Sequence, residues 1–344
     1  MRPTSRSNHH FGGPELRPEV RRWLAARTSA AGDWPVRDLV AAKGNTTVSV
    51  VLPAHNEAET VGLIVEMVRE LMMRRHRLVD ELVVVDSCST DATAEVAEAA
   101  GATVVRQDEV LSHLPPLTGK GEALWKGLYA TSGDVVAFID ADLIGCPPEF
   151  VTGLLGPLLA DRGVAYVKGL YRRPLIRAGH VEPDGGGQVT ELVARPLLNL
   201  YWPRLAGFVQ PLAGEYAGRR EVLEAVPFVS HYGIEIALLI DLLELVGLDA
   251  LAQVDLGERR HRNQGTEALG RMSAQVMLTA FDRLERQGRG RAPDAPARLA
   301  QFRHVAAAGG GRREALVTDV TVPERPPLAT VREMAAAAAP GRQS

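Results

Sequence analysis

The stretch VSVVLPAHNE, residues 48–57, decides how the chain folds. It opens with a short, mostly apolar run that ends at Pro53, a pattern typical of a strand that is buried on both faces of a sheet. Apolar residues then recur at helical spacing from Val61 to Met72, which predicts a helix directly after the strand. A buried strand followed by a helix is the repeating unit of an α/β protein.

The alternation of strand and helix continues through the first half of the chain. The expected strands are Glu81–Val85, Ala102–Arg106 and Val135–Ile139, and the expected helices are Thr90–Ala100 and Gly121–Ala130. Alternation with short loops predicts a mostly parallel sheet with right-handed crossovers. The carboxyl ends of such strands are the first place to look for a ligand site.

From Phe150 onward the alternation loosens. Further helices are expected near 20–31, 148–159, 191–200, 219–225, 234–245 and 267–287, and further strands near 165–170 and 250–256. We interpret 19–150 as a nucleotide-binding half and 151–290 as an acceptor-binding, catalytic half. The polar residues 1–18 are expected to be a disordered N-terminus, and 291–344 a flexible C-terminal tail.

Composition excludes several classes of protein. The 344 residues carry 39 Lys and Arg against 42 Asp and Glu, so the chain lacks the cationic surplus of a protein that coats nucleic acid. Two cysteines exclude a disulfide framework and favour a reducing compartment. No uncharged apolar run approaches the roughly 20 residues that span a bilayer, and no secretory signal opens the chain. We therefore expect a cytoplasmic protein without stable membrane insertion.

Polar residues follow the first strand at Asn56 and Glu57. Their side chains can accept hydrogen bonds from the base or ribose of a nucleotide. The alternative is a helix cap followed by a first-turn Glu that favours the helix dipole. The sequence is equally compatible with both interpretations.

Carboxylates also follow the second and fourth strands. Asp86 suits a ribose or base contact, although the Ser and Thr residues after it suit a helix cap. Asp140 and Asp142 point to one side if the strand geometry continues. One can then hold a ribose hydroxyl while the other ligates Mg²⁺ or Mn²⁺, which prefer oxygen ligands. Asp-x-Asp is common by chance, but its position after a fourth parallel strand strengthens this interpretation.

Four more segments carry candidate residues. Lys120 stands between two glycines at the start of an expected helix. Its ammonium group can lie near a phosphate or base of a nucleotide, or it belongs to a first helical turn that is exposed to solvent. The loop before Thr190 can bind an anion through its N–H groups or be a flexible connection. Glu235 opens an apolar helix, where a carboxylate is costly to bury without a partner. Residues 259–263 (RRHRN) carry several positive charges. They can bind a diphosphate and a phosphorylated acceptor, or they form a basic run exposed to solvent.

Together, the motifs PAHNE (53–57), DSCSTD (86–91) and DAD (140–142) resemble nucleotide-sugar glycosyltransferases with the GT-A fold. Four motifs of the second half narrow the resemblance to the actinobacterial glucosyl-3-phosphoglycerate synthase family: GGGQVTELVARPLL (185–198), QPLAGEY (210–216), YGIE (232–235) and HRN (261–263). The resemblance covers residues 20–287. It implies an α/β GT-A fold with a Rossmann-like, mostly parallel sheet.

The resemblance implies a retaining, Mg²⁺-dependent transfer of glucose from UDP-glucose to the 2-hydroxyl of 3-phosphoglycerate, as in methylglucose lipopolysaccharide synthesis. Mn²⁺ and a GDP donor stay open. The implied contacts to the uridine side are Pro53, Ala54, Asn56, Glu57, Ser87 and Lys120, with Asp140 at the ribose and Asp142 and His261 on the metal. The resemblance also implies that Tyr232 and Glu235 lie beside the sugar and Arg259 near the diphosphate. The residues that it implies for 3-phosphoglycerate are Gly187, Thr190 and Asn263.

One position departs from the family pattern, which has Arg directly before Val-Thr where this chain has Gln188. We include Gln188 among the acceptor-binding residues, but a neutral amide cannot grip a phosphate or carboxylate as a guanidinium does. Either Arg259, Arg262 or the loop amides compensate, or the acceptor binds more weakly.

Several alternatives remain at the level of sequence. Glu235 is the nominated nucleophile if retention proceeds by double displacement, and a positioning role in a front-face reaction is favoured. Three other functions compete. Inverting transfer to a polyprenyl phosphate usually needs a membrane helix or an amphipathic membrane-binding segment, and nucleotidyl transfer usually needs a glycine-rich phosphate loop. The third is non-catalytic sensing of a nucleotide sugar. The resemblance also implies a homodimer.

Overall fold

A computed structural model describes residues 16–173, 175–177, 180–182, 187–259, 265–293, 297–305 and 312–338. In this part of the chain, the central feature is one eight-stranded sheet in the order β1-β11-β6-β9-β5-β2-β3-β4. Its strands are β1 (Thr28–Ala30), β2 (Val48–Ala54), β3 (Glu81–Asp86), β4 (Thr103–Arg106), β5 (Val135–Phe138), β6 (Tyr166–Arg172), β9 (Tyr216–Arg219) and β11 (Leu251–Glu258).

The sheet is parallel except at β9, which runs antiparallel to both of its neighbours, β5 and β6. The strands β5, β2, β3 and β4 form one parallel group, and β6, β11 and β1 form the other. This confirms the predicted mostly parallel α/β sheet. Because β9 runs antiparallel to both β5 and β6, the two parallel groups point in the same direction, and their carboxyl ends lie at the same edge of the sheet.

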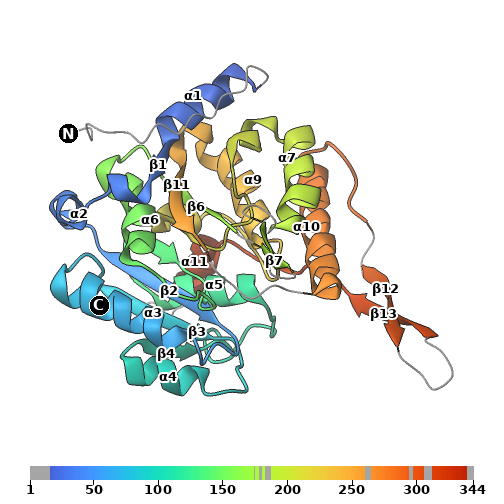
Figure 1. Cartoon of the computed structure of the whole chain (residues 1–344), viewed down its shortest axis with the longest axis horizontal. Coiled ribbons are helices and arrows are strands. Elements are labelled where there is room, and N and C mark those ends of the chain that lie inside the picture. Colours follow the sequence, from blue (N-terminus) through green and yellow to red (C-terminus); the bar gives the residue numbers. More distant parts are fainter. Residues whose placement is uncertain are drawn as a thin grey trace.

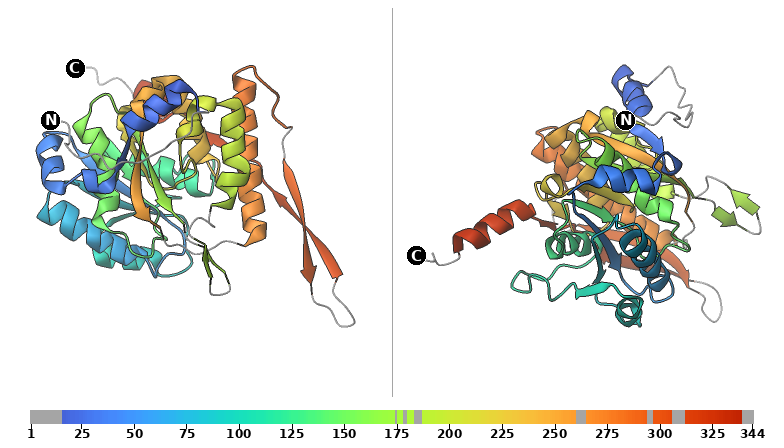
Figure 2. Two further views of the ribbon diagram at one scale, coloured as in Figure 1. Left: turned by 45° about the horizontal axis from the view of Figure 1, so that its top comes forward. Right: turned by 90° about the vertical axis from the view of Figure 1, so that its left-hand side faces the viewer.

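Helices cover both faces of the sheet (Figures 1 and 2). One face packs against α2 (Val36–Lys43), α3 (Val61–Met67), α4 (Thr93–Ala100) and α6 (Pro148–Ala160). The other face packs against α1 (Pro18–Arg27), α5 (Lys120–Ala130), α7 (Arg195–Tyr201), α9 (Ile234–Val246), α10 (Thr266–Arg286) and the start of α11 (Leu328–Ala338). Within β2, Val51 faces one layer and Val50 and Leu52 face the other. This is why a buried parallel strand reads as a nearly continuous apolar run.

The remaining elements lie outside the eight-stranded sheet and its two helical layers. They are α8 (Arg220–Leu223), the strand pairs β7 (Leu175–Arg177) with β8 (His180–Glu182), β10 (Phe228–Val229) with β14 (Glu324–Arg325) and β12 (Arg298–Val305) with β13 (Arg312–Asp319), π-helical turns over 68–75 and 190–194, and 3₁₀ turns over 31–33, 203–207 and 248–250. Figure 2 shows the β12–β13 hairpin and α11 standing away from the body of the molecule.

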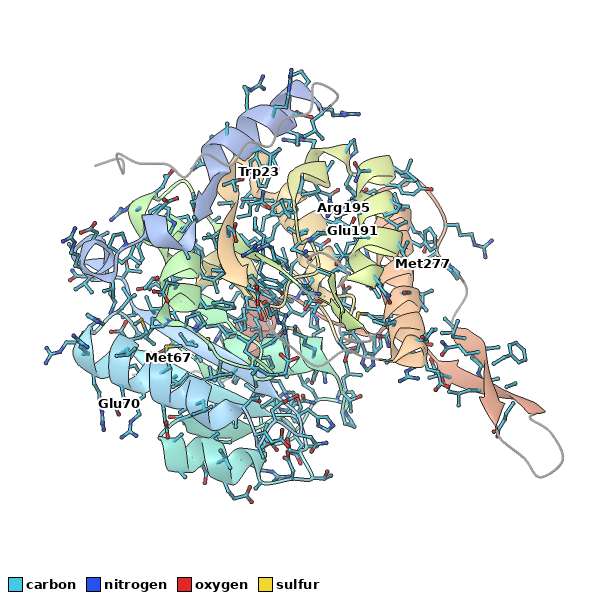
Figure 3. All side chains as sticks on the ribbon, in the orientation of Figure 1. Trp23, Met67, Glu70, Glu191, Arg195 and Met277 are labelled. Atoms are coloured by element: carbon cyan, nitrogen blue, oxygen red, sulfur yellow. The ribbon has the colours of Figure 1, made fainter. Side chains whose placement is uncertain are left out.

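The N-terminal helix is shorter than the sequence predicts. The helix expected over 20–31 ends at Arg27, and the next three residues form β1, which pairs with β11 at the sheet edge. Trp23 anchors this helix, because its indole lies inside the protein and donates a 2.7 Å hydrogen bond to the carbonyl of Leu251 (Figure 3). Hydrogen bonding to an open strand edge here outweighs the helix propensity of the alanines that follow.

Two further boundaries differ from expectation. The helix expected from Thr90 begins at Thr93, because the carboxylate of Asp91 accepts the backbone N–H of Thr93 and residues 87–92 form a loop. The helix expected over 219–225 shrinks to α8, and the strand β9 before it was missed. The four residues of β9 include Gly218 and Arg219, so they give no apolar run from which to predict a central strand.

The C-terminal segment also differs from the predicted flexible tail. Part of it folds against the chain, since β14 pairs with β10 and Leu328 lies in the core. The indole N–H of Trp125 donates a 3.0 Å hydrogen bond to the carbonyl of Pro326. Among the described residues, none of the helices has the length and apolar character needed to cross a bilayer.

Candidate active site

The candidate site lies at the carboxyl edge of the parallel strands. The segments that follow β2, β3, β5, β6 and β11 all reach it, and the residues before β9 return to it. Ligands of open α/β sheets bind at such an edge, where the chain connections diverge. A cleft of about 860 Å³ opens there, a size suited to a small-molecule ligand.

Most of the predicted site residues line this one cleft. They are Pro53, Ala54, Glu57, Ser87, Lys120, Asp140, Asp142, Gly187, Gln188, Thr190, Tyr232, Glu235 and Arg259. Their positions in the sequence span more than half of the chain, so the fold brings together the residues that the motifs selected. Two predicted residues, His261 and Asn263, lie outside the described residues.

Lys120 joins two of the predicted carboxylates. Its ammonium group lies 2.6 Å from Oδ1 of Asp140 and 3.0 Å from Oε1 of Glu235, and Glu235 is 4% exposed. Burial alone lowers the pKa of Lys120, but the charges of Asp140 and Glu235 outweigh it and hold the pKa above its usual value. Lys120 thus supplies the partner without which the Glu235 carboxylate would be costly to bury.

Arg259 forms the second half of the same charge cluster. Its Nη2 lies 2.9 Å from Asp140 and 2.8 Å from Asp142, and its Nη1 lies 3.2 Å from Glu215. Burial raises the pKa of Asp140, but Lys120 and Arg259 outweigh it and hold that pKa well below its usual range. Burial raises the pKa of Glu215, against the effect of Arg259. Lys120, with 19% of its side chain exposed, and the buried Arg259 therefore keep Asp140 ionised in the lining of the cleft.

Gly214 allows this close packing. A side-chain carbon at position 214 would collide with a carboxylate oxygen of Asp140 and with the ammonium group of Lys120. Steric exclusion therefore explains why the QPLAGEY motif has a glycine at this position. It leaves room for the ion pair that joins the end of β5 to the start of α5.

The carboxylates fit a divalent cation. Oxygens of both Asp140 and Asp142 converge on one guanidinium nitrogen of Arg259, so the two side chains already share one cation. Asp142 is the more accessible of the two, with 35% of its side chain exposed in the cleft. Carboxylate oxygen is the ligand that Mg²⁺ and Mn²⁺ prefer. Among the described residues, no three His, Cys, Asp or Glu side chains form a complete metal cluster, and the predicted second ligand His261 is not among them.

The wall near β2 and β3 holds the residues predicted to contact the nucleotide, with two corrections. Asn56 does not line the cleft: its side-chain oxygen accepts the backbone N–H of Thr90 at 2.8 Å and shapes the loop after β3. Asp86 is buried and lies near the backbone N–H of Ser89 instead of the cleft. In both cases the local loop uses the polar side chain that the sequence offered for a ligand.

Ser87 remains at the cleft and is fixed by its neighbour. Its hydroxyl donates a 2.6 Å hydrogen bond to Oε1 of Gln107, which also lines the cleft. The amide nitrogen of Gln107 in turn donates to the carbonyl of Leu117. This part of the wall is therefore held rigidly by side-chain hydrogen bonds.

Sequence reasoning missed several residues of the site. Arg173, Tyr171, Glu215 and Lys168 were given no role, yet Arg173 lines the cleft and the other three lie buried beside it. Arg173 follows directly after β6, so the strand-end rule that selected Asp140 would also have selected Arg173. Lys168 interrupts an otherwise apolar strand, and burial lowers its pKa to about 7. A charge within an apolar strand is a signal that could have been used.

The chain is similar to glycosyltransferases of known name. Residues 49–181 match the family described as Glycosyl transferase family 2. Glucosyl-3-phosphoglycerate synthase of Mycolicibacterium smegmatis is 50% identical over 90% of this chain and 98% of that protein. The protein of the same name from Mycobacterium tuberculosis H37Rv is 47% identical over 87% of this chain and 90% of its own length.

Two solved structures resemble this one closely. Mannosyl-3-phosphoglycerate synthase from Rubrobacter xylanophilus has a TM-score of 0.81 and 40% identity, over 92% of this chain and 99% of that one. Glucosyl-3-phosphoglycerate synthase from M. tuberculosis, solved with Mn²⁺, UDP-glucose and phosphoglyceric acid, has a TM-score of 0.75 and 45% identity, over 87% of this chain and 96% of that one. The chain belongs to the glucosyl-3-phosphoglycerate synthase family.

Proposed function

We propose that this protein transfers glucose from UDP-glucose to the 2-hydroxyl of 3-phosphoglycerate with retention of configuration, assisted by Mg²⁺ or Mn²⁺. The observation that carries the proposal is the cleft in which two cations join three carboxylates: Lys120 pairs with Glu235 and Asp140, and Arg259 pairs with Asp140 and Asp142. Relatives that cover nearly the whole chain carry the name of this activity.

The donor lies, in this proposal, along the wall formed by β2 and β3. Pro53, Ala54, Glu57 and Ser87 contact the uridine side, and Asp140 contacts the ribose. Asn56 acts indirectly, by shaping the loop after β3. Lys120 supports Asp140 and Glu235 through ion pairs instead of contacting the uridine directly.

Asp142 and His261 are the proposed protein ligands of the cation. A divalent cation bound there supplies Lewis-acid stabilisation of the departing diphosphate. Arg259 adds a fixed positive charge at the same place, because its guanidinium already contacts Asp142 at 2.8 Å. A preorganised charge of this kind stabilises developing negative charge without further rearrangement.

Glu235 has a positioning role in this proposal. The ion pair with Lys120 fixes its carboxylate, and Tyr232, 40% exposed, lies one helical turn before it beside the cleft. A carboxylate already paired with a buried ammonium is a weakened nucleophile, which favours holding the sugar hydroxyls over attacking the sugar. The acceptor proton then leaves with the diphosphate oxygen in a front-face reaction.

The test is an assay of UDP release from purified protein with UDP-glucose, 3-phosphoglycerate and Mg²⁺, each omitted in turn. We expect release only when all three are present. UDP release without 3-phosphoglycerate, or pyrophosphate release from UTP and a sugar phosphate, would replace this proposal with hydrolysis or nucleotidyl transfer. Transfer to a polyprenyl phosphate is excluded by the same assay if 3-phosphoglycerate alone supports turnover.

Mannosyl transfer is the second candidate. The solved relative from R. xylanophilus, named for mannosyl transfer, superposes with a TM-score of 0.81. Replacing UDP-glucose with GDP-mannose in the same assay decides between the donors. Faster turnover with GDP-mannose would make mannosyl transfer the main activity.

The cytoplasmic location and the homodimer stay predictions. The β12–β13 hairpin bears on the dimer, because Phe302 is 71% exposed and Val317 is 57% exposed on it. An isolated two-stranded hairpin is only marginally stable in water, so a contact with a second copy of the chain would stabilise it. Light scattering on the wild type and on Phe302→Asp measures whether a dimer forms through this hairpin.

A further inference from the structure

Three arginine or lysine side chains among the described residues line the cleft: Lys120, Arg173 and Arg259. Two of them already hold carboxylates, since Lys120 pairs with Asp140 and Glu235, and Arg259 pairs with Asp140, Asp142 and Glu215. Arg173 makes no carboxylate contact with the described part of the chain. Among the residues that the structure describes, no carboxylate therefore balances the positive charge that Arg173 brings to the cleft.

The geometry around Arg173 leaves a donor unused. Its Nη2 donates a 2.7 Å hydrogen bond to the hydroxyl of Tyr171, and the guanidinium lies 4.9 Å from the centre of that ring. Its Nε is buried and has no hydrogen-bond partner among the described residues. A buried charged donor without a partner is costly, which indicates that a ligand supplies the missing acceptor.

Arg173 is also linked to the catalytic cluster. Arg259 donates a 2.8 Å hydrogen bond to the same hydroxyl of Tyr171, and its backbone N–H donates to the carbonyl of Arg172. Tyr171 thus joins the two guanidinium groups. An anion bound by Arg173 would therefore lie close to Arg259, the residue proposed to face the diphosphate. The reacting hydroxyl of the acceptor must also lie close to the diphosphate, so this position suits an acceptor.

The wall formed by residues 187–190 lacks a charge of its own. Gly187, Gln188 and Thr190 line the same cleft as Arg173, and Gln188 is neutral and exposed. The side-chain oxygen of Gln210, which lies near Gly187, is buried and has no hydrogen-bond partner in the portion of the chain that the structure describes. This part of the cleft offers hydrogen bonds to a ligand but no cation, although 3-phosphoglycerate carries a phosphate and a carboxylate.

We propose that Arg173 binds an anionic group of the acceptor, its phosphate or its carboxylate, and so supplies the charge that Gln188 does not. The inference rests on the proposed function, because it takes 3-phosphoglycerate as the acceptor. The hydroxyl of Tyr171 takes only one of the two N–H groups of Nη2, so the unpaired Nε and a remaining Nη donor of Arg173 can bind one anion in the two-pronged manner that phosphates and carboxylates favour.

Arg173→Gln tests the assignment by steady-state kinetics of UDP release. We expect kcat/KM for 3-phosphoglycerate to fall about 10- to 100-fold, the range for a lost charge-assisted hydrogen bond, while the KM for UDP-glucose and the Kd of UDP with Mg²⁺ stay nearly unchanged. Arg173→Lys should recover part of the loss. A KM for 3-phosphoglycerate equal to that of the wild type, or a rise confined to UDP-glucose, overturns the proposal.

Truncated acceptors identify the group that Arg173 binds. D-glycerate lacks the phosphate and glycerol 3-phosphate lacks the carboxylate, and each is tested as acceptor or as competing inhibitor. The effect of Arg173→Gln should vanish for D-glycerate if Arg173 binds the phosphate, and for glycerol 3-phosphate if it binds the carboxylate. An undiminished effect on both compounds contradicts a direct contact.

Three variants separate a direct contact from a structural effect. Arg172→Gln is the matched control, because Arg172 is the exposed neighbour and should keep wild-type constants. Tyr171→Phe removes the shared hydroxyl but keeps the charge, and a loss as large as that of Arg173→Gln would show that Arg173 acts only through Tyr171. Gln188→Arg, added to Arg173→Gln, should restore part of the acceptor affinity.

The two levels of proposal fail differently. A wild-type protein that releases no UDP when 3-phosphoglycerate is added contradicts the proposed function. A wild-type protein that turns over normally, with an Arg173→Gln variant that matches it, contradicts only the role of Arg173.

Discussion

Arg325 and Glu122 lie 203 positions apart in the chain and share two hydrogen bonds of 2.8 Å inside the protein. The guanidinium also donates to the carbonyl of Pro115 and lies 5.4 Å from the centre of the Trp125 ring. Ser230, at the end of β10, donates from both its backbone N–H and its hydroxyl to the carbonyl of Pro323. The C-terminal segment therefore holds the loop that leads into Tyr232 and the active site.

The first prediction concerns this ion pair. Arg325→Met removes two hydrogen bonds from the buried carboxylate of Glu122 and leaves it paired only with the ammonium group of Lys126 at 3.3 Å, so we expect the free energy of unfolding to fall by about 1.5–3 kcal/mol. Urea unfolding measures the change. Arg74→Met is the control, because Arg74 pairs with Glu70 on the surface and its loss should cost at most about 1 kcal/mol. Equal, small losses in both variants would show that the C-terminal segment does not support the fold.

The pair also marks the limit of prediction from this sequence. The strands in the first half of the chain were predictable because those that are buried, such as Val48–Leu52, are mostly apolar runs that polar residues follow within a few positions. The C-terminal segment was not, because Arg325 stabilises it through a partner on α5 that no local pattern reveals. The strand β9 was missed for a similar reason, since its place in the sheet comes from pairing with β5 and β6.

The candidate site shows the same division. Strand ends and motifs selected Asp140, Asp142 and Glu235, because residue type and position are enough for that. They could not show that Asn56 shapes a loop or that the buried Nε of Arg173 has no hydrogen-bond partner within the described part of the chain. Such statements depend on which side chains meet, and only the folded chain decides that.

The second prediction concerns Glu235. Glu235→Gln keeps the shape of the side chain but removes the charge that pairs with Lys120, so we expect turnover to fall about 100-fold or more through misplaced reacting groups. Binding of UDP with Mg²⁺, measured by calorimetry, should be retained. Glu244→Gln, an exposed position on the same helix, is the matched control. Turnover near that of the wild type would remove Glu235 from the reaction.

The third prediction concerns Asp142 and the metal. Asp142→Ala should abolish the part of UDP-glucose binding that depends on Mg²⁺ or Mn²⁺, because the cleft loses the more accessible of the two aspartates that share Arg259. Calorimetry with metal and with EDTA measures that part directly. Treating the wild type with EDTA should likewise stop UDP release, and added Mg²⁺ should restore it. Metal-dependent binding of normal strength in the variant would refute the assignment of Asp142 as a ligand.

The fourth prediction uses the two cysteines. Cys88 is exposed and lines the cleft, whereas burial, together with the charge of Glu215, raises the pKa of Cys146 to about 12. A thiol reagent at neutral pH should therefore modify Cys88 first and Cys146 slowly, because the thiolate is the reactive form. Bound UDP-glucose with Mg²⁺ should slow the modification of Cys88, as mass spectrometry of the labelled peptides will show. Cys88→Ser is the control. If Cys88 reacts at the same rate with and without UDP-glucose, the donor does not bind next to Cys88.

The last prediction concerns stability and pH. Lys168 is buried, with its ammonium group 4.5 Å from the centre of the Tyr216 ring and 3.4 Å from the hydroxyl of Tyr166. Burial, with a smaller effect of the positive charge of Lys120, lowers its pKa to about 7, and the charges of Glu235, Glu215 and Asp140 only partly oppose this. An unfolded lysine keeps a pKa near 10.4, so the unfolded chain binds the extra proton at any pH between these values.

Stability of the wild type should therefore rise with pH from about 7 to 10, by at most about 1.4 kcal/mol per pH unit from this group. Below pH 7 the full cost of burying the charged lysine is present, and above the unfolded pKa it is gone. Lys168→Met removes the cost, so this variant should exceed the wild type in stability at pH 7 and lose that advantage as the pH approaches 10. Urea unfolding of both proteins at pH 7, 8 and 9 measures the difference, in which the titration of groups remote from Lys168 cancels. A difference that stays constant across this range would show that Lys168 keeps an ordinary pKa in the folded protein.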